Sequence, residues 1–153
     1  MKKIFCNTAR CTGCEACVIA CAVEHSKSKN IFKAIKEDPL PRARRSVQVA
    51  GGKAILSIAC RHCNPAPCVQ ACMSGSMFKD DKGETVHDLE KCVGCGMCMM
   101  VCPFGAISKQ KQIALKCDLC PERDDGDYAC VKACPTKALF VGTIEEFEKK
   151  VGT

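Results

Sequence analysis

Apolar side chains occur in short runs along this chain, and cysteines, glycines and charged residues separate the runs. Residues 3–7 have the apolar pattern of a strand. Residues 77–86 place an apolar pair on each side of a polar, glycine-containing turn, which predicts a β-hairpin. Residues 143–150 (TIEEFEKK) predict a terminal helix with Thr143 as its N-cap. No run approaches the roughly 18–20 apolar residues of a membrane-spanning helix.

Residues 26–53 form a polar, basic segment without cysteine. Pro39 and Pro41 would end any helix begun around residues 31–35. Residues 47–58 have the pattern of a strand that continues after a turn made by two glycines. We interpret the whole segment as a connector with solvated basic side chains, and an interface is the alternative interpretation.

The composition changes this picture, because the chain has 17 cysteines in 153 residues and no tryptophan. Leu, Ile, Val and Phe together number 32, close to the roughly one fifth of a chain below which disorder is the default. So few large apolar side chains would not offset the conformational entropy of folding. An odd number of cysteines also excludes a fully paired set of disulfides. The cysteines must therefore help to hold the fold together.

Sixteen of the cysteines fall into four groups of four. The first and third groups have the spacing C-x2-C-x2-C-x3-C, and the second and fourth stretch one spacer to x4 or x9. Zinc sites usually combine two C-x2-C pairs across a longer arm, whereas this compact run is typical of bacterial ferredoxins. We therefore favour 4Fe-4S clusters over a zinc-binding structural or interaction module. The groups are Cys11, Cys14, Cys17, Cys21; Cys60, Cys63, Cys68, Cys72; Cys92, Cys95, Cys98, Cys102; and Cys117, Cys120, Cys130, Cys134.

This spacing has a physical reason. Three cysteines on one tight turn reach three iron corners of one cubane, and the fourth, on the following helical turn, faces a different cluster. Pro103 and Pro135 follow the last cysteines of groups three and four and turn the chain there. Residues 102–107 and 134–139 therefore predict a helical turn followed by a short strand. We expect the loops to direct backbone N–H groups at the cluster sulfurs.

The four groups, their order and their spacers resemble a known family. Its members are four-cluster polyferredoxin-like electron-transfer subunits that accompany molybdenum and tungsten oxidoreductases, hydrogenases and carbon monoxide dehydrogenases. The matching segments are residues 11–25, 60–72, 91–107 and 116–139, which span most of the chain. Residues 24–42 (EHSKSKNIFKAIKEDPLPR) resemble most the carbon monoxide dehydrogenase-associated branch.

The resemblance implies an α+β fold made of two bacterial-ferredoxin-like dicluster modules, with short β-hairpins and short helices around the clusters. Residues 1–53 and 112–153 would form the first module, and residues 54–111 would form a second module inserted within it. Group one would exchange its fourth cysteine with group four, and group two with group three. We name the implied ligand sets site I (Cys11, Cys14, Cys17, Cys134), site II (Cys21, Cys117, Cys120, Cys130), site III (Cys60, Cys63, Cys68, Cys102) and site IV (Cys72, Cys92, Cys95, Cys98).

The expected function is electron relay rather than catalysis. The sequence has no GxGxxG, P-loop, GxSxG or HExxH motif, so no enzyme chemistry accompanies the cysteines. We expect single electrons to pass through four 4Fe-4S clusters between a catalytic oxidoreductase subunit and a second redox protein. Carbon monoxide dehydrogenase is the favoured catalytic partner, and a tungsten or molybdenum aldehyde or formate oxidoreductase or a hydrogenase is the alternative. A free-standing soluble polyferredoxin is the rival function.

Charge and targeting signals narrow the partners further. The formal net charge is +6 with neutral thiols, but four thiolates on an oxidised cubane leave −2 per cluster, so the loaded protein would carry about −2. This weakens any interpretation as a nucleic-acid-binding protein. The segment MKKIFCNTAR has neither a signal-peptide core nor a twin-arginine signal. We therefore expect a cytoplasmic protein of anaerobic metabolism without its own membrane anchor, and self-association stays open.

A few residues outside the four groups invite a functional interpretation. His62 lies inside a cysteine loop, and we expect it to tune a cluster by hydrogen bonding rather than to ligate iron. Cys6 is the odd thiol, which we interpret as unliganded and partly buried. The methionines around group three are interpreted as packing residues, because methionine fills irregular gaps beside bulky groups. These methionines are Met97, Met99 and Met100.

Overall fold

The structure, a computed structural model, describes residues 3–52, 54–123 and 127–151. Within these residues the strands pair two at a time, as four separate antiparallel ribbons. The strands are β1 (Lys3–Cys6), β2 (Arg45–Ala50), β3 (Ala54–Ala59), β4 (Met77–Lys79), β5 (Thr85–His87), β6 (Ile107–Gln110), β7 (Ile113–Lys116) and β8 (Leu139–Gly142). The helices are α1 (Ala16–Glu24), α2 (Ile31–Ala34), α3 (Pro67–Gln70), α4 (Met97–Met100), α5 (Ala129–Lys132) and α6 (Ile144–Val151).

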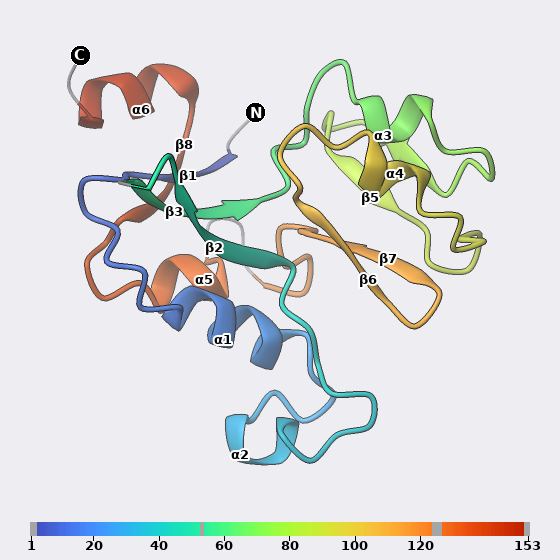
Figure 1. Cartoon of the computed structure of the whole chain (residues 1–153), viewed down its shortest axis with the longest axis horizontal. Helices are drawn as coiled ribbons and strands as arrows, with labels where there is room; N and C mark the ends of the chain where they lie inside the picture. Colours follow the sequence, from blue (N-terminus) through green and yellow to red (C-terminus); the bar gives the residue numbers. More distant parts are fainter. Residues whose placement is uncertain (1–2, 53, 124–126, 152–153) are drawn as a thin grey trace.

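The ribbons are arranged in two halves, which lie side by side in Figure 1. One half holds the β1–β8 ribbon, α6 and the packed pair α1 and α5, and the other holds α3, α4 and the ribbons β4–β5 and β6–β7. Because β1 pairs with β8, with Lys3 opposite Gly142 and Cys6 opposite Leu139, segments far apart in sequence meet in one half. The chain of the other half runs between them.

The predicted local elements are confirmed. The strand expected at residues 3–7 is β1, and the hairpin expected at residues 77–86 is β4–β5, with Met77 opposite His87. The expected terminal helix is α6. Thr143 caps it, since its hydroxyl accepts a hydrogen bond from the N–H of Glu146 at 3.4 Å. The Glu146 carboxylate accepts the N–H of Thr143 at 3.0 Å, which completes a capping box.

The prediction after groups three and four is confirmed only in part, because residues 102–106 and 134–138 are turns rather than helix, and the short strands β6 and β8 follow them. Helix α4 is followed by strand β6, and helix α5 is followed by strand β8. The strand expected to continue past two glycines instead doubles back, since β2 and β3 pair antiparallel from Arg45 opposite Ala59. Gly51 and Gly52 have φ of 58° and 71°, the left-handed conformation that a tight hairpin turn requires.

The predicted module boundaries coincide with hairpin turns. Residue 53 is outside the described residues, and the boundary after it falls in sequence between β2 and β3; residues 111–112 lie between β6 and β7. Each boundary would therefore divide one two-stranded ribbon between two modules. The division into modules stays a prediction.

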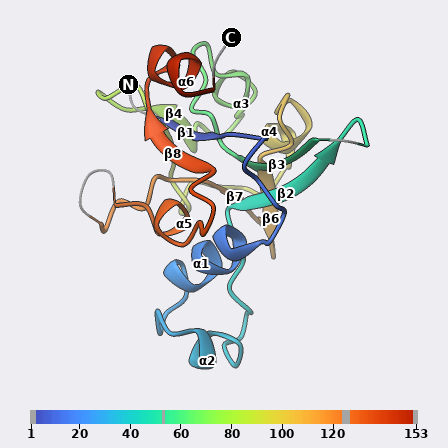
Figure 2. The ribbon, with the colours of Figure 1, turned by 90° about the vertical axis from the view of Figure 1, so that its left-hand side faces the viewer.

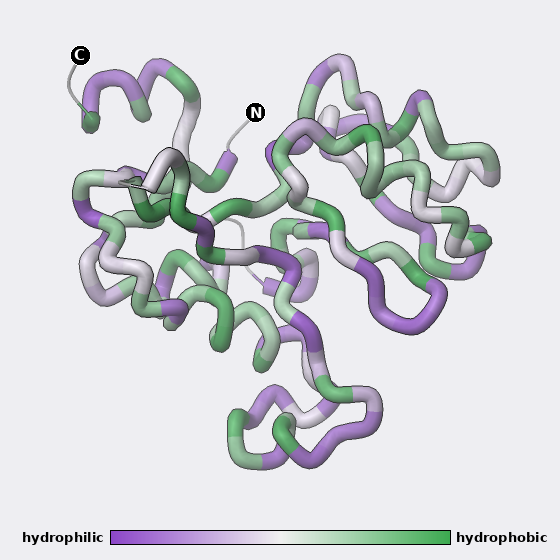
Figure 3. Tube along the Cα trace, in the orientation of Figure 1, coloured by the Kyte–Doolittle hydropathy of each residue, from purple (hydrophilic) through white to green (hydrophobic). Residues whose placement is uncertain are grey.

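Cysteine sulfur makes up much of each small core. In the first half, Cys17, Cys120 and Cys130 are buried with Leu119, Tyr128 and Leu139. In the second half, the buried cluster is Met77, Cys98, Ile107 and Ala114. Figure 3 shows the apolar positions as short stretches scattered over both halves, as the sequence pattern predicts. Among the described residues no helix is both long and apolar enough to cross a membrane.

The part of the connector that precedes β2 forms a lobe that projects away from both halves (Figure 2). Its helix α2 ends at Ala34, before the two prolines, and Asn30 caps it by accepting the N–H of Phe32 at 3.0 Å. The Glu37 carboxylate accepts the backbone N–H groups of Lys27 and Ser28 at 3.0 and 2.9 Å, which closes the lobe at its base.

Candidate metal centres

The four cysteines of site I line one cavity in the first half. Cys11 and Cys14 come from the loop after β1, Cys17 from the first turn of α1, and Cys134 from the end of α5. Gly13 has φ of 72°, and a Cβ there would lie 3.1 Å from a methyl group of Ile55, so this tight loop favours glycine. The geometry supports the predicted ligand set, including the exchanged cysteine from group four.

The four cysteines of site IV line a second cavity, in the other half. Gly94 lies between the first two cysteines of group three, and a Cβ there would lie 2.2 Å from the carbonyl oxygen of Gln112. Only glycine fits at this close approach, with φ of 71°. Two cavities of the same construction therefore occur in the two halves.

The thiols of site II lie close enough together to shift one another's pKa. Burial raises the pKa of Cys21 to about 12, against a hydrogen bond from the Arg44 backbone N–H at 3.3 Å. The neighbouring thiols of the site raise it further; these are Cys117, Cys120 and Cys130. Burial also raises the pKa of Cys117 to about 11. Because metal ligands must be thiolates, loading this site would release protons held firmly at neutral pH.

Site III is the ligand set for which the geometry gives the least detail. Burial raises the pKa of Cys68, and the neighbouring thiols of Cys60 and Cys102 contribute to that rise. The N–H of His62 donates to the Cys60 sulfur at 3.4 Å. For Cys63 the assignment continues to rest on the family resemblance.

Each exchanged cysteine receives a backbone N–H, as expected for these loops. Arg44 donates to the Cys21 sulfur, Met77 to Cys72 at 3.4 Å and Ala106 to Cys102 at 3.4 Å. At Cys134 burial would raise the pKa, but hydrogen bonds from the Leu139 backbone and from other donors outweigh burial and lower it. At Cys72 burial is likewise outweighed, by the hydroxyl of Ser76 at 3.2 Å and other donors, and the pKa falls to about 7. N–H donors of this kind stabilise a charged sulfur.

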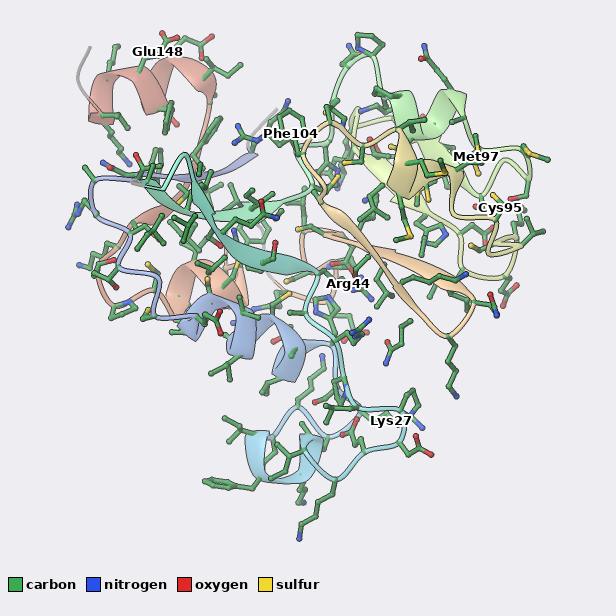
Figure 4. The ribbon with its side chains drawn as sticks, in the orientation of Figure 1. Lys27, Arg44, Cys95, Met97, Phe104 and Glu148 are labelled. Atoms are coloured by element: carbon green, nitrogen blue, oxygen red, sulfur yellow. The ribbon has the colours of Figure 1, made fainter. Side chains whose placement is uncertain are left out.

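A charged network surrounds site II where the connector joins the body. The Nε2 of His25 lies 3.1 Å from the Asp118 carboxylate, and the Arg44 guanidinium contacts the same carboxylate. Figure 4 shows Arg44 near the centre of the molecule, where the connector enters β2. Burial would raise the pKa of Asp118, but the hydrogen bond from His25 and the charge of Arg44 outweigh it and hold the pKa at about 2. The network ties group four to α1 and to the connector.

The ring of His62 pairs with β5 through one nitrogen, and the expectation that it tunes a cluster by hydrogen bonding stays a prediction. It is 2% exposed, and its Nδ1 accepts the N–H of Thr85 at 3.0 Å, so the ring pairs with β5. Burial, together with the charge of Lys116, lowers the pKa of His62 to about 3, so the ring is neutral at physiological pH. The contact with a cysteine sulfur comes from the backbone N–H.

Lys116 is the site residue that sequence reasoning missed. It is 3% exposed, and its amine donates to the Cys117 carbonyl at 2.7 Å. Among the described residues no carboxylate lies within ion-pair distance of it, although a buried cation is costly unless paired. Its charge also acts on the thiol of Cys68, so it lies near both site II and site III. Clusters with a net charge of −2 would supply the missing partner, so this chain fits that cofactor.

A strand pattern could have identified Lys116. Strand β7 alternates between half-buried and buried positions, with Ala114 and Lys116 in the buried phase. A lysine in the buried phase of an apolar strand is an unusual residue there.

Cys6 is half-buried, as expected, and its sulfur accepts the N–H of Ser57 at 3.4 Å. Burial raises the pKa of this thiol. Among the methionines of α4, Met99 packs against the buried cluster as expected, whereas Met100 is 81% exposed and Met97 is 37% exposed. Figure 4 places Met97 beside Cys95 at the outer edge of the second half, so these side chains partly face solvent.

Comparisons with known proteins agree with this chemistry. A family model described as a 4Fe-4S dicluster domain matches residues 53–144, and one described as a 4Fe-4S binding domain matches residues 8–24. The iron-sulfur protein of Rhodospirillum rubrum is 38% identical over 160 residues, which cover 94% of this chain and 83% of that protein. Electron transport protein HydN of Escherichia coli (strain K12) is 34% identical over 154 residues, covering 90% and 85%.

Other matches differ in length or identity. UacF of Escherichia coli (strain K12) is 43% identical over 140 residues, but these residues are only 21% of its length. A chain of the active site complex BamBC of benzoyl coenzyme A reductase with 1,5-dienoyl-CoA has a TM-score of 0.50 at 24% identity, covering 93% of this chain and 75% of that chain. That likeness concerns the fold alone. Because the dicluster model matches more than half of its residues, the chain belongs to the 4Fe-4S dicluster domain family.

Proposed function

We propose that this chain is a non-catalytic electron-transfer subunit that carries single electrons through four 4Fe-4S clusters, one at each of sites I to IV. The observation that carries the proposal is the grouping of sixteen cysteines into four sets, two of which each line one cavity. A bound 4Fe-4S cluster supplies one-electron redox chemistry. The chain itself holds each cluster, directs N–H groups at the sulfurs and limits access of water.

The order of the sites supports a continuous path. The thiol of Cys17 acts on the pKa of Cys130, so sites I and II are neighbours. The thiol of Cys68 acts on the pKa of Cys98, so sites III and IV are neighbours as well. Lys116 lies near sites II and III and would link the two pairs electrostatically. Electrons would therefore pass in the order I, II, III, IV or the reverse.

The same neighbour relations support an inserted second module. Sites I and II draw on groups one and four, whose segments meet where β1 pairs with β8 and α1 packs on α5. Sites III and IV draw on groups two and three, which lie in the other half. We propose residues 1–53 and 112–153 as the first module and residues 54–111 as the insertion, with the two hairpins that cross the boundaries as the connection.

The partners belong to the proposal as well. A catalytic oxidoreductase subunit would stand at one end of the path and a second redox protein at the other. Carbon monoxide dehydrogenase is the catalytic partner that residues 24–42 favour by resemblance, ahead of a tungsten or molybdenum enzyme or a hydrogenase. The complex would work in the cytoplasm.

Anaerobic preparation of the whole chain tests the proposal. We expect about 16 iron atoms and about 16 sulfides per chain, and magnetically interacting clusters in the EPR spectrum of the reduced protein. Four zinc ions and no iron would refute it. Cys21→Ser should alter the cluster of site II and leave site I unchanged, while Cys6→Ser should keep all four clusters. Pull-down with mass spectrometry should recover a catalytic subunit; elution alone at 16.5 kDa would favour the free-standing carrier.

A further inference from the structure

A basic groove lies on the first half, beside site I. Four cations line it from separate segments: Arg10 from the loop after β1, Lys132 from α5, Lys137 from the turn before β8, and Lys150 from α6. All four side chains are exposed. Cys134, a predicted ligand of site I, lines the same groove. Among its described lining residues there is no carboxylate, so the groove presents positive charge beside one cluster site.

The groove has an apolar floor beneath its cations. Val131, Leu139 and Phe140 lie in the lining. The amine of Lys150 lies 4.6 Å from the centre of the Phe140 ring, which holds this cation over the floor. Lys132 has a distant partner, since its amine is 3.8 Å from the Asp127 carboxylate, but both groups are solvent-exposed and the pair is weak. Cations around an apolar centre form the usual pattern of a protein-docking surface.

The opposite end of the proposed path has a different character. Cys95 of site IV is exposed, and Val93, which lines the same cavity, is 69% exposed. In Figure 4, Cys95 lies at the outer edge of one half, whereas β8, α5 and α6 belong to the other half. One cation, Lys109, lines the cavity of site IV, against four in the basic groove, so a partner attracted by positive charge would approach site I.

We propose that the basic groove is the docking surface of an acidic one-electron carrier protein, which exchanges electrons with the cluster of site I. The inference rests on the proposed function, because it requires a cluster at that site. In each encounter the reduced partner loses one electron and the oxidised partner gains it, with no bond formed and no proton moved. Electrostatic attraction raises the rate of such encounters without requiring a large interface.

The test uses the loaded whole chain and two probes of opposite charge. Reduced protein is mixed in a stopped-flow instrument with plastocyanin, an acidic one-electron acceptor, or with cytochrome c, a basic one. The groove variant combines Arg10→Gln, Lys132→Gln and Lys137→Gln. The matched control combines Lys27→Gln, Lys33→Gln and Lys36→Gln, which removes the same charge from the exposed connector lobe.

At about 10 mM ionic strength we expect the groove variant to react about tenfold more slowly with plastocyanin, and the lobe variant to change less than about twofold. The differences in the plastocyanin rate between each variant and the wild-type chain should vanish near 0.5 M salt, where screening removes the electrostatic attraction between the two proteins. The rate with cytochrome c should not fall in the groove variant. Equal slowing in both triple variants, or no slowing in either, would refute the groove as the docking surface.

Failure of the proposed function gives a different result. Iron content and the visible absorption bleached by dithionite are measured first, and a wild-type chain without iron refutes the function and this inference together. If the wild-type chain is fully loaded but the groove variant reacts with plastocyanin as fast as the wild-type chain does, only the groove proposal is refuted. If the triple groove variant loses iron, Lys150→Gln carries the test, because α6 contains no cysteine. It should slow the plastocyanin reaction about twofold, and an unchanged rate would refute the proposal.

Discussion

Replacing Asp118 by asparagine removes a single charge at the point where three segments meet. The Asp118 carboxylate accepts hydrogen bonds from His25, at the end of α1, and from Arg44, at the end of the connector. It also accepts the N–H of Cys120 at 3.2 Å, within group four. Asparagine keeps the shape of the side chain but loses the negative charge between two basic groups. We expect site II to lose its cluster more readily.

The magnitude follows from the pKa. Its fall from the ordinary 3.8 to about 2 corresponds to about 2.4 kcal/mol, at 1.36 kcal/mol per pKa unit. The side chain keeps 30% of its surface exposed, so screening reduces this to about 1.5 kcal/mol, or about tenfold in a rate. Because the pKa is lowered in the folded state, the stabilisation is complete above pH 3.8 and is lost as the pH falls toward 2. At pH 7 the carboxylate is fully ionised, so its pairing with Arg44 is fully present.

The assay follows the loss of visible cluster absorption in mild urea with an iron chelator, without oxygen. Asp118→Asn should lose its first cluster about tenfold faster than the wild-type chain at pH 7. Glu122→Gln is the matched control, because its carboxylate, 75% exposed, pairs with Lys29 in the same region and such pairs contribute little. Equal rates for Asp118→Asn and wild type at pH 7 would contradict this account of Asp118.

Three further changes test the sites. Gly94→Ala should abolish the cluster of site IV in iron analysis and EPR, since the new Cβ would clash with the Gln112 carbonyl. Gly96→Ala is the control: it has open space around it, so it should only lower the free energy of unfolding by about 1–2 kcal/mol, the cost of its left-handed backbone conformation. Lys116→Met should lower the reduction potentials of sites II and III in an EPR titration and leave site I unchanged, because a nearby cation favours the reduced cluster. Chemical reconstitution of the metal-free chain should load site II more slowly at pH 7 than at pH 8.5, because burial raises the pKa of all four thiols there. Loading of site IV should depend less on pH, since hydrogen bonds lower the pKa of Cys72 to about 7 against the effect of burial.

The sequence predicted the local structure well because its signals are local. The capping box of Thr143, the hairpin at residues 77–86 and the short strands after groups three and four each depend on a few adjacent residues. The cysteine groups are also compact, so their chemistry can be read from spacing. The β2–β3 hairpin was less clear, because alternating apolar residues do not say whether the chain turns back at two glycines.

What the sequence could not supply are the contacts between distant segments. The Asp118 network joins residues 93 positions apart, and the basic groove draws its cations from four segments. Sequence reasoning treated the arginines after the prolines as solvated, but Arg44 contacts Asp118 and Arg45 is 8% exposed, with its Nε donating to the Ser57 hydroxyl at 2.9 Å. Such pairings depend on how the two halves pack around the connector, which no local pattern records.

The charges of the interior bear on whether this chain can fold before it is loaded. Lys116 is a buried cation, and the thiols of site II are buried where thiolates are disfavoured. Without clusters, the cation has no anionic partner among the described residues and the thiols stay protonated. With clusters, the thiolates are ligands, and their net negative charge offsets the cation. The same arrangement that destabilises the empty chain therefore stabilises the loaded one, so folding and cluster binding should occur as one event rather than in sequence.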